Sequence, residues 1–209
     1  MQDKLYIVRT FSLLTLTLAV YCLLWQFLCT RTTLPVYYYG RLIEVLALGL
    51  FILLFLTTPM QFESMGICVP RRVLFRSLAL GGGLSLAFLL LLAAARAARD
   101  GAVVFSLCIA GNISRVTYFL VAPLQEVLAK SVMYCSLERC FEERSALMAT
   151  VMSALIFSLF HVVYGIQMML LAMALSLVTG WLFSRARCVW GCALLHFVCG
   201  FFPACFGFG

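Results

Sequence analysis

Two ionisable residues stand inside an otherwise apolar stretch, Ala122–Met133, which reads APLQEVLAKSVM. Glu126 and Lys130 are four residues apart, so on a helix they share a face and can pair. An ionisable side chain at the centre of a bilayer costs at least ~2.5–3.5 kcal/mol, so such residues usually have partners and a function. The two histidines of the chain, His161 and His196, are the partners we expect. These residues predict a catalytic site inside a membrane bundle; the alternative is that Glu126 and Lys130 pair only to hold helices together.

The composition of the chain indicates a membrane protein. Of its 209 residues, 65% are hydrophobic and 11% are charged, which is more apolar surface than a soluble domain of this size can bury. The net charge of +7 comes from arginines that lie mainly between apolar runs, as in the flanks of membrane helices. We therefore expect the lipid bilayer as a partner and no nucleic acid, because a basic polar surface is lacking. The ten cysteines lie mostly in apolar runs and lack CxxC spacing, so we interpret them as core residues.

The apolar runs predict an all-α, polytopic bundle of about seven transmembrane helices, in one membrane-embedded domain over residues 1–209. A run of about 20 residues is long enough to cross a bilayer. A β-barrel is excluded because no alternating pattern is present. The distribution of arginine places the N-terminus, with Lys4 and Arg9, in the cytoplasm. The expected spans are Leu5–Cys29, Tyr39–Thr58, Ser77–Ala95, Arg115–Ser136, two within Ser145–Phe183 that part at Tyr164-Gly165, and Cys188–Phe206.

Local features add further expectations for single elements. Arg41 and Glu44 are three residues apart near the start of the second span, and we interpret them as a local ion pair rather than a substrate-binding site. Gly81-Gly82-Gly83 is a place where helix backbones can approach closely. Pro123 is expected in the first turn of its helix, where its missing N–H loses no hydrogen bond. Pro59–Arg76 and Arg96–Gly101 are expected to be polar breaks between spans.

Three motifs in the second half of the chain resemble those of a known family. The CAAX-protease and bacteriocin-processing family of intramembrane proteases, also called Abi or type II CAAX prenyl endopeptidases, has a Glu-Glu-x-x-x-Arg motif, a Phe-x-x-x-His motif, and a His followed four residues later by a small or amide residue. The resemblance covers roughly Arg115 to the C-terminus and implies a family-like core over 115–209. The corresponding segments are Gln125-Glu126-Val127-Leu128-Ala129-Lys130, Phe157-Ser158-Leu159-Phe160-His161 and His196-Phe197-Val198-Cys199-Gly200.

Three positions depart from the family pattern. Gln125 replaces the first Glu, Lys130 replaces the Arg, and Gly200 replaces the usual Asn. The family's base is usually taken to be the first Glu, and an alignment from Pro123 would place Glu126 there instead. Either way one carboxylate remains in this motif. A catalytically degenerate scaffold or immunity protein of the same fold is therefore the alternative to an active protease.

The resemblance implies hydrolysis of a peptide bond in a membrane-associated or lipidated peptide, such as a prenylated CAAX peptide, a bacteriocin leader or a signal-type peptide. The reaction must deprotonate a water, stabilise an oxyanion and protonate the leaving amine. A buried Glu126 suits the first task, and the imidazoles of His161 and His196 suit the other two. These three residues are the predicted catalytic set.

Four residues are expected to support this set. Lys130 would hold Glu126 or balance its charge, and Gln125 would orient a neighbour rather than react. Phe157, one turn before His161, would pack against the imidazole. Gly200, one turn after His196, would leave room but supply no hydrogen bond.

The predicted catalytic residues are also a possible zinc set. Two histidines, one glutamate and a water form a known catalytic zinc site, so Glu126, His161 and His196 are the ligands if metal is present. No HExxH motif occurs, and the resemblance allows both a metalloprotease and a metal-independent glutamic protease. We favour the metal-free mechanism and expect no cofactor.

Overall fold

The computed structural model describes residues 2–31, 33, 35–57, 62–107, 113–141 and 145–208, and no strand occurs among them. α4, η1 and α5 follow one another without a break, so the described helices form seven rods joined by short segments. The predicted all-α bundle is confirmed. The elements are α1 (Gln2–Arg31), α2 (Val36–Thr57), α3 (Arg71–Asp100), α4 (Ile113–Glu126), the π-helix η1 (Val127–Tyr134), α5 (Cys135–Cys140), α6 (Ser145–Leu159), the 3-10 turn η3 (Val162–Tyr164), α7 (Ile166–Ala186) and α8 (Val189–Cys205).

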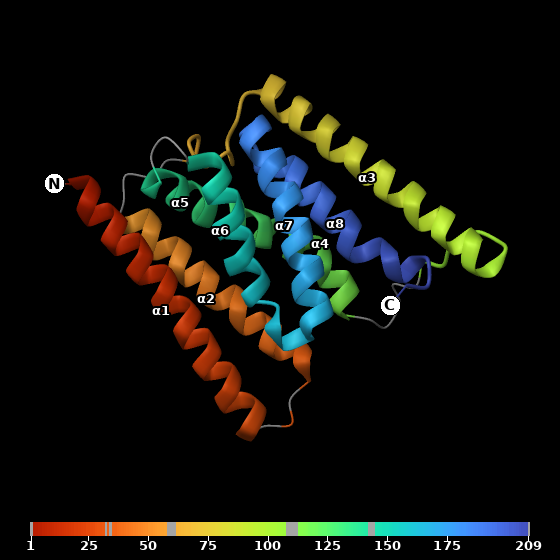
Figure 1. The fold of residues 1–209 in the computed structure, drawn as a ribbon, viewed down its shortest axis with the longest axis horizontal. Coiled ribbons are helices and arrows are strands. Elements are labelled where there is room, and N and C mark those ends of the chain that lie inside the picture. The colour runs from red at the N-terminus through yellow and green to blue at the C-terminus, as the bar shows by residue number, and fades with distance from the viewer. Residues whose placement is uncertain are drawn as a thin grey trace.

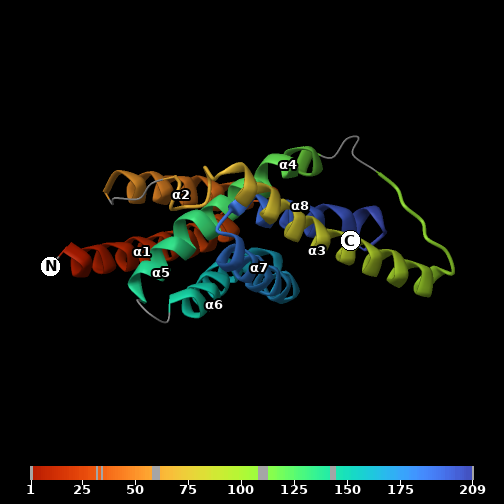
Figure 2. The same ribbon diagram turned by 90° about the horizontal axis from the view of Figure 1, so that it is seen from above.

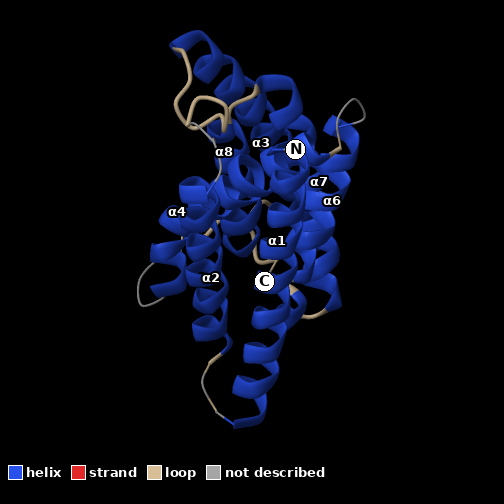
Figure 3. Ribbon diagram, turned by 90° about the vertical axis from the view of Figure 1, so that its left-hand side faces the viewer, coloured by secondary structure: helices blue, strands red, loops and turns tan. Residues whose placement is uncertain are grey.

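The rod made of α4, η1 and α5 lies at the centre of the bundle (Figures 1 and 2). α1 and α2 pack together at one side, and α3 lies along α8 at the other. α6 and α7 form a second hairpin that also contacts the central rod. Figure 3, coloured by secondary structure, shows how far helices dominate the described chain. The central rod therefore meets α2, α6, α7 and α8, and can collect side chains from all of them.

The outer surface of the bundle is suited to lipid. Three helical segments are long and apolar enough to cross a membrane, Val8–Leu28, Arg71–Asp100 and Ile166–Ala186, and two shorter apolar helices are Ala146–Leu159 and Val189–Cys205. Large apolar side chains point outward, with Leu23, Leu56 and Leu120 exposed by 71%, 74% and 72%. Because exposing apolar area to water costs about 25 cal/mol per Å², a surface of this kind is more stable against lipid than against water. The protein is thus an integral membrane helix bundle.

The third expected span is longer than predicted. α3 begins directly after Pro70 and runs to Asp100, so the predicted breaks Pro59–Arg76 and Arg96–Gly101 lie partly within a helix. Arg96 Nε lies 2.7 Å from Asp100 Oδ2, and such an i, i+4 ion pair stabilises the last helical turn. Gly101, with a φ of 73°, then ends the helix, and its N–H donates to Ala97 O.

Pro123 does not lie in a first helical turn, as predicted, but well inside α4. The prediction was wrong because the helix begins at Ile113, before the apolar run that contains the proline. A proline inside a helix removes one i to i−4 hydrogen bond. The rod changes from α- to π-helix four residues later, at Val127.

The predicted break at Tyr164-Gly165 is confirmed. α6 ends at Leu159, η3 follows, and Gly165 adopts a φ of 90°, which a side chain would disfavour. The chain reverses here and α7 begins at Ile166. His161 therefore lies in a turn rather than within a span.

The close approach expected at the glycine run occurs where α3 crosses α8. A Cβ at Gly81 would overlap the backbone of Gly191, and a Cβ at Gly191 would overlap Ser77. Ser77 Oγ accepts a hydrogen bond of 3.1 Å from the Gly191 N–H. Gly83, by contrast, faces open space. One glycine of the run thus sets the distance between α3 and α8, the helix that carries His196.

Candidate functional site

Glu126 and His196 meet at the contact between the central rod and α8. Glu126 is the last residue of α4, and His196 lies within α8, which packs along α4. The Nδ1 atom of His196 lies 2.9 Å from Oε1 of Glu126, and because a carboxylate accepts, the proton of this hydrogen bond is on Nδ1. Glu126 is fully buried, His196 is 4% exposed, and Oε2 of Glu126 has no hydrogen-bond partner among the described residues. The sequence-predicted acid and one predicted histidine thus form a buried pair.

Lys130 is fully buried but does not pair with Glu126 as expected. Its Nζ donates to Ser176 O at 2.9 Å and to Ser176 Oγ at 2.8 Å, on α7. Among the described residues, no ion pair within 4.0 Å joins Lys130 to Glu126, although the two charges interact at longer range. Ser176 of α7, which packs against η1, takes the ammonium group instead.

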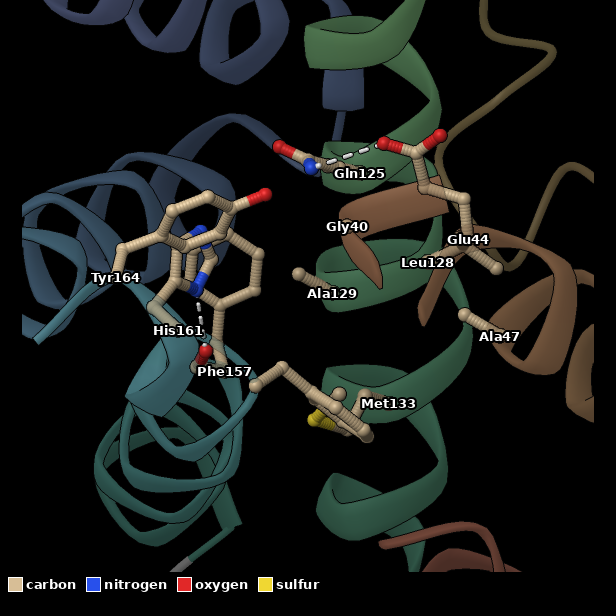
Figure 4. Close-up of a pocket in the computed structure, with 11 residues that line it drawn as sticks. Gly40, Glu44, Ala47, Gln125, Leu128, Ala129, Met133, Phe157, His161 and Tyr164 are labelled. Carbon is tan, nitrogen blue, oxygen red and sulfur yellow. Dashed lines mark hydrogen bonds between the residues drawn. The ribbon is translucent and has the colours of Figure 1, made fainter. Parts of the chain in front are cut away.

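His161 lines a pocket beside the central rod. It follows the end of α6, and its Nδ1 lies 2.8 Å from Phe157 O, so the backbone carbonyl accepts the Nδ1 proton. The pocket has a volume of about 40 Å³, room for a few waters, and its walls come from α2, the central rod and the α6–α7 turn (Figure 4). His161, Gln125 and Glu44 are polar groups of its lining.

Gln125 and Glu44 place an amide and a second carboxylate in this pocket. Gln125 Nε2 donates to Glu44 Oε1 at 3.4 Å, so the amide meets a neighbouring side chain, as its predicted orienting role requires (Figure 4). Glu44 Oε2 also lies 2.8 Å from Arg41 Nη1, which confirms the predicted local ion pair. The sequence interpretation missed that Glu44 also lines the pocket of His161. The two segments are 81 residues apart, and no local pattern joins them.

Phe157 lies between the two imidazoles. Its ring centroid is 4.7 Å from that of His161 and 5.9 Å from that of His196. Phe157 therefore packs the imidazole of His161, as expected, and that of His196 as well. Both predicted histidines thus contact this ring, and His196 also hydrogen-bonds Glu126. In the described part of the chain, no hydrogen bond joins His161 to either member of the pair.

The predicted zinc set does not fit a metal ion as arranged. A catalytic zinc site needs three side chains that converge on one point. Here Nδ1 of His196 is bonded to Glu126, and His161 faces the pocket across Phe157. No group of three or more His, Cys, Asp or Glu side chains in the described residues could hold a metal.

Gly200 lies one turn after His196, and the space beside it is filled by Tyr118. A Cβ at Gly200 would overlap the Tyr118 hydroxyl group. The Tyr118 ring also meets His196, with centroids 6.1 Å apart at an interplanar angle of 70°. The sequence analysis missed Tyr118, although it lies eight residues before Glu126 and hence near the same face of α4.

Comparisons with known proteins agree with the motifs. The family model described as Type II CAAX prenyl endopeptidase Rce1-like matches residues 85–202, more than half of the chain. No curated protein and no solved structure matches. The matched region runs from α3 into α8 and contains Glu126, His161 and His196; it begins earlier than the core expected over 115–209. The chain therefore belongs to the type II CAAX prenyl endopeptidase Rce1-like family, a family of CAAX-type intramembrane proteases.

Proposed function

We propose that this chain is an intramembrane endopeptidase that hydrolyses a peptide bond of a membrane-associated or lipidated peptide. The observation that carries the proposal is the 2.9 Å hydrogen bond between His196 and Glu126 at a fully buried position of the family-matched region. One oxygen of Glu126 is held by this bond, and the other, Oε2, has no partner among the described residues. A carboxylate oriented in this way can take a proton from water.

The proposed reaction needs no covalent intermediate with the protein. The oxygen of a water bonds to the carbonyl carbon of the substrate while one water proton passes to Oε2 of Glu126. His196 donates to Oε1 and holds the carboxylate in place. His161, whose Nδ1–H is bonded to Phe157 O, presents Nε2 as an acceptor that can hold a water in its own pocket. The carbon–nitrogen bond then breaks, and the leaving amine receives the proton from Glu126.

The proposal is tested by cleavage of a peptide library by purified protein in detergent. The library contains prenylated CAAX peptides, bacteriocin leaders and signal-type peptides. Glu126→Gln keeps the side-chain volume and removes the base, so turnover falls by a factor of ~10² or more. Glu63→Gln is the matched control, because Glu63 is exposed in the loop before α3. Folded Glu126→Gln protein with near wild-type cleavage would refute the proposal, and a wild type that cleaves no peptide would support the scaffold alternative.

A further inference from the structure

The site needs a hydrogen-bond donor for the oxyanion, and its two histidines do not supply one in their neutral form. A neutral imidazole has one donor and one acceptor. In His196 the donor is Nδ1, bonded to Glu126, and in His161 it is Nδ1, bonded to Phe157 O. Both Nε2 atoms are then acceptors. A negative charge on the former carbonyl oxygen of the substrate therefore requires a donor from another side chain.

Tyr118 carries an O–H group and lies close to His196. It lies on α4 and precedes Glu126 by about two helical turns, and α4 packs along α8. Its ring meets His196 edge to face and stacks on Phe197, with centroids 6.1 and 6.2 Å apart. Tyr118 is thus next to His196 and on the same helix as Glu126.

The absence of a side chain at position 200 is what admits the phenol. A Cβ at Gly200 would overlap the Tyr118 hydroxyl and lie too close to the ring carbons that bear it. The hydroxyl therefore occupies the space that a side chain one turn after His196 would fill. Another residue at position 200 would have to displace it.

We propose that the Tyr118 hydroxyl stabilises the oxyanion on the His196 side of the site. This inference deepens the proposed function and rests on it. As the water oxygen bonds to the substrate carbon, the two electrons of the carbon–oxygen π bond move to the carbonyl oxygen. The Tyr118 O–H donates a hydrogen bond to that oxygen and keeps its proton. When the carbonyl re-forms, the hydrogen bond weakens and the amine leaves.

The first test is Tyr118→Phe, which removes the hydroxyl and keeps the ring that packs against His196. With a library peptide that the wild type cleaves, kcat falls by a factor of ~10²–10³, the effect of losing one oxyanion donor, while KM changes little. Tyr38→Phe is the matched control, because Tyr38 is 56% exposed near the start of α2. A trifluoromethyl ketone analogue of the same peptide, whose hydrate resembles the tetrahedral intermediate, loses affinity for Tyr118→Phe in parallel with kcat.

The second test moves the donor to the other helix. Tyr118→Ala removes the phenol and opens the space beside Gly200, and adding Gly200→Asn places an amide donor there. Tyr118→Ala with Gly200→Asn recovers at least tenfold of the kcat lost in Tyr118→Ala, whereas Tyr118→Ala with Gly200→Leu fills the space and recovers none.

Two results would overturn the inference: wild-type kcat in Tyr118→Phe, or equal recovery with Asn and Leu, which would mean that Tyr118 acts by packing alone. Neither result touches the proposed function as long as Glu126→Gln remains inactive. Activity of Glu126→Gln would instead overturn the proposed function itself.

Discussion

Glu126 and His196 hydrogen-bond each other across two helices, whereas the hydrogen bond of His161 in the described chain is to Phe157 of its own segment. His196 hydrogen-bonds the fully buried Glu126, and His161 contacts the backbone carbonyl of Phe157 from a partly exposed turn. Removing a hydrogen-bond partner from a buried polar group costs ~1–3 kcal/mol, and more if the group is charged. The two histidines therefore have different structural roles within one site.

We predict that His196→Ala and His161→Ala differ in stability but not in activity. Both lose cleavage activity, because each removes a group that holds the reactants. His196→Ala also lowers the free energy of unfolding by ~1–3 kcal/mol or more, because it removes a hydrogen bond from the buried Glu126 carboxylate. His161→Ala changes it by less than ~1 kcal/mol. Thermal unfolding in detergent measures the difference, and equal stabilities would show that the 2.9 Å bond does not hold Glu126.

The sequence predicted that Glu126 and His196 lie close together, as they do in the structure, because polar groups in a long apolar run have few possible partners. It did not locate the partner of Lys130, because Ser176 is 46 residues away in the sequence and no local pattern joins the two. Glu44 and Tyr118 were missed as site residues for a different reason. Their places depend on how α2 and α8 pack against the central rod, which local spacing does not encode.

At the scale of elements, the crossing of α3 and α8 holds His196 against the central rod. Ser77, Gly81 and Gly191 let the two backbones touch, and this crossing adjoins the α8 segment that carries the histidine. The sequence predicted the close approach from the glycine run but could not say which of the three glycines faces α8. It also placed helix ends several residues inside the true ends of α3, because ion pairs and a left-handed glycine decide where a helix ends.

We predict that Gly81→Ala destabilises the protein and that Gly83→Ala does not. A methyl group at position 81 overlaps the Gly191 backbone, so the two helices separate, and both the melting temperature and the activity fall. Position 83 faces open space, and alanine is favoured over glycine within helices by up to ~1 kcal/mol, so Gly83→Ala is neutral or stabilising. Parallel melting curves in one detergent make the comparison. A loss in both variants would mean that the whole glycine run, and not the crossing, is needed.

At the scale of the whole molecule, an apolar exterior encloses a small polar interior. The exposed leucines face lipid, while Glu126, Lys130 and His196 are buried among the helices. The sequence composition was enough to predict an apolar exterior around a polar interior. The cytoplasmic N-terminus is a prediction from the distribution of the arginines. The metal-free mechanism is a prediction from the residues of the site.

We predict that metal chelators leave cleavage unchanged. As arranged, no three His, Cys, Asp or Glu side chains of the described residues could hold a metal, and Nδ1 of His196 and of His161 are bonded to Glu126 and to Phe157 O. Purified wild-type protein incubated with EDTA or 1,10-phenanthroline keeps its activity, and elemental analysis finds zinc well below one ion per chain. Loss of activity that added zinc restores would contradict the metal-free mechanism and would require His161 to move toward the pair.

The most direct test of the central claim compares Glu126 with Glu44, the carboxylate that lines the pocket of His161. Glu44 is already held by Arg41 at 2.8 Å and by Gln125, whereas Oε2 of Glu126 has no partner among the described residues. Glu126 is therefore the group that can accept a proton from water. Measured as kcat on the same peptide in reconstituted vesicles, Glu126→Gln falls by ~10² or more and Glu44→Gln by less than tenfold. A larger loss in Glu44→Gln than in Glu126→Gln would contradict the account and move the base to the pocket of His161.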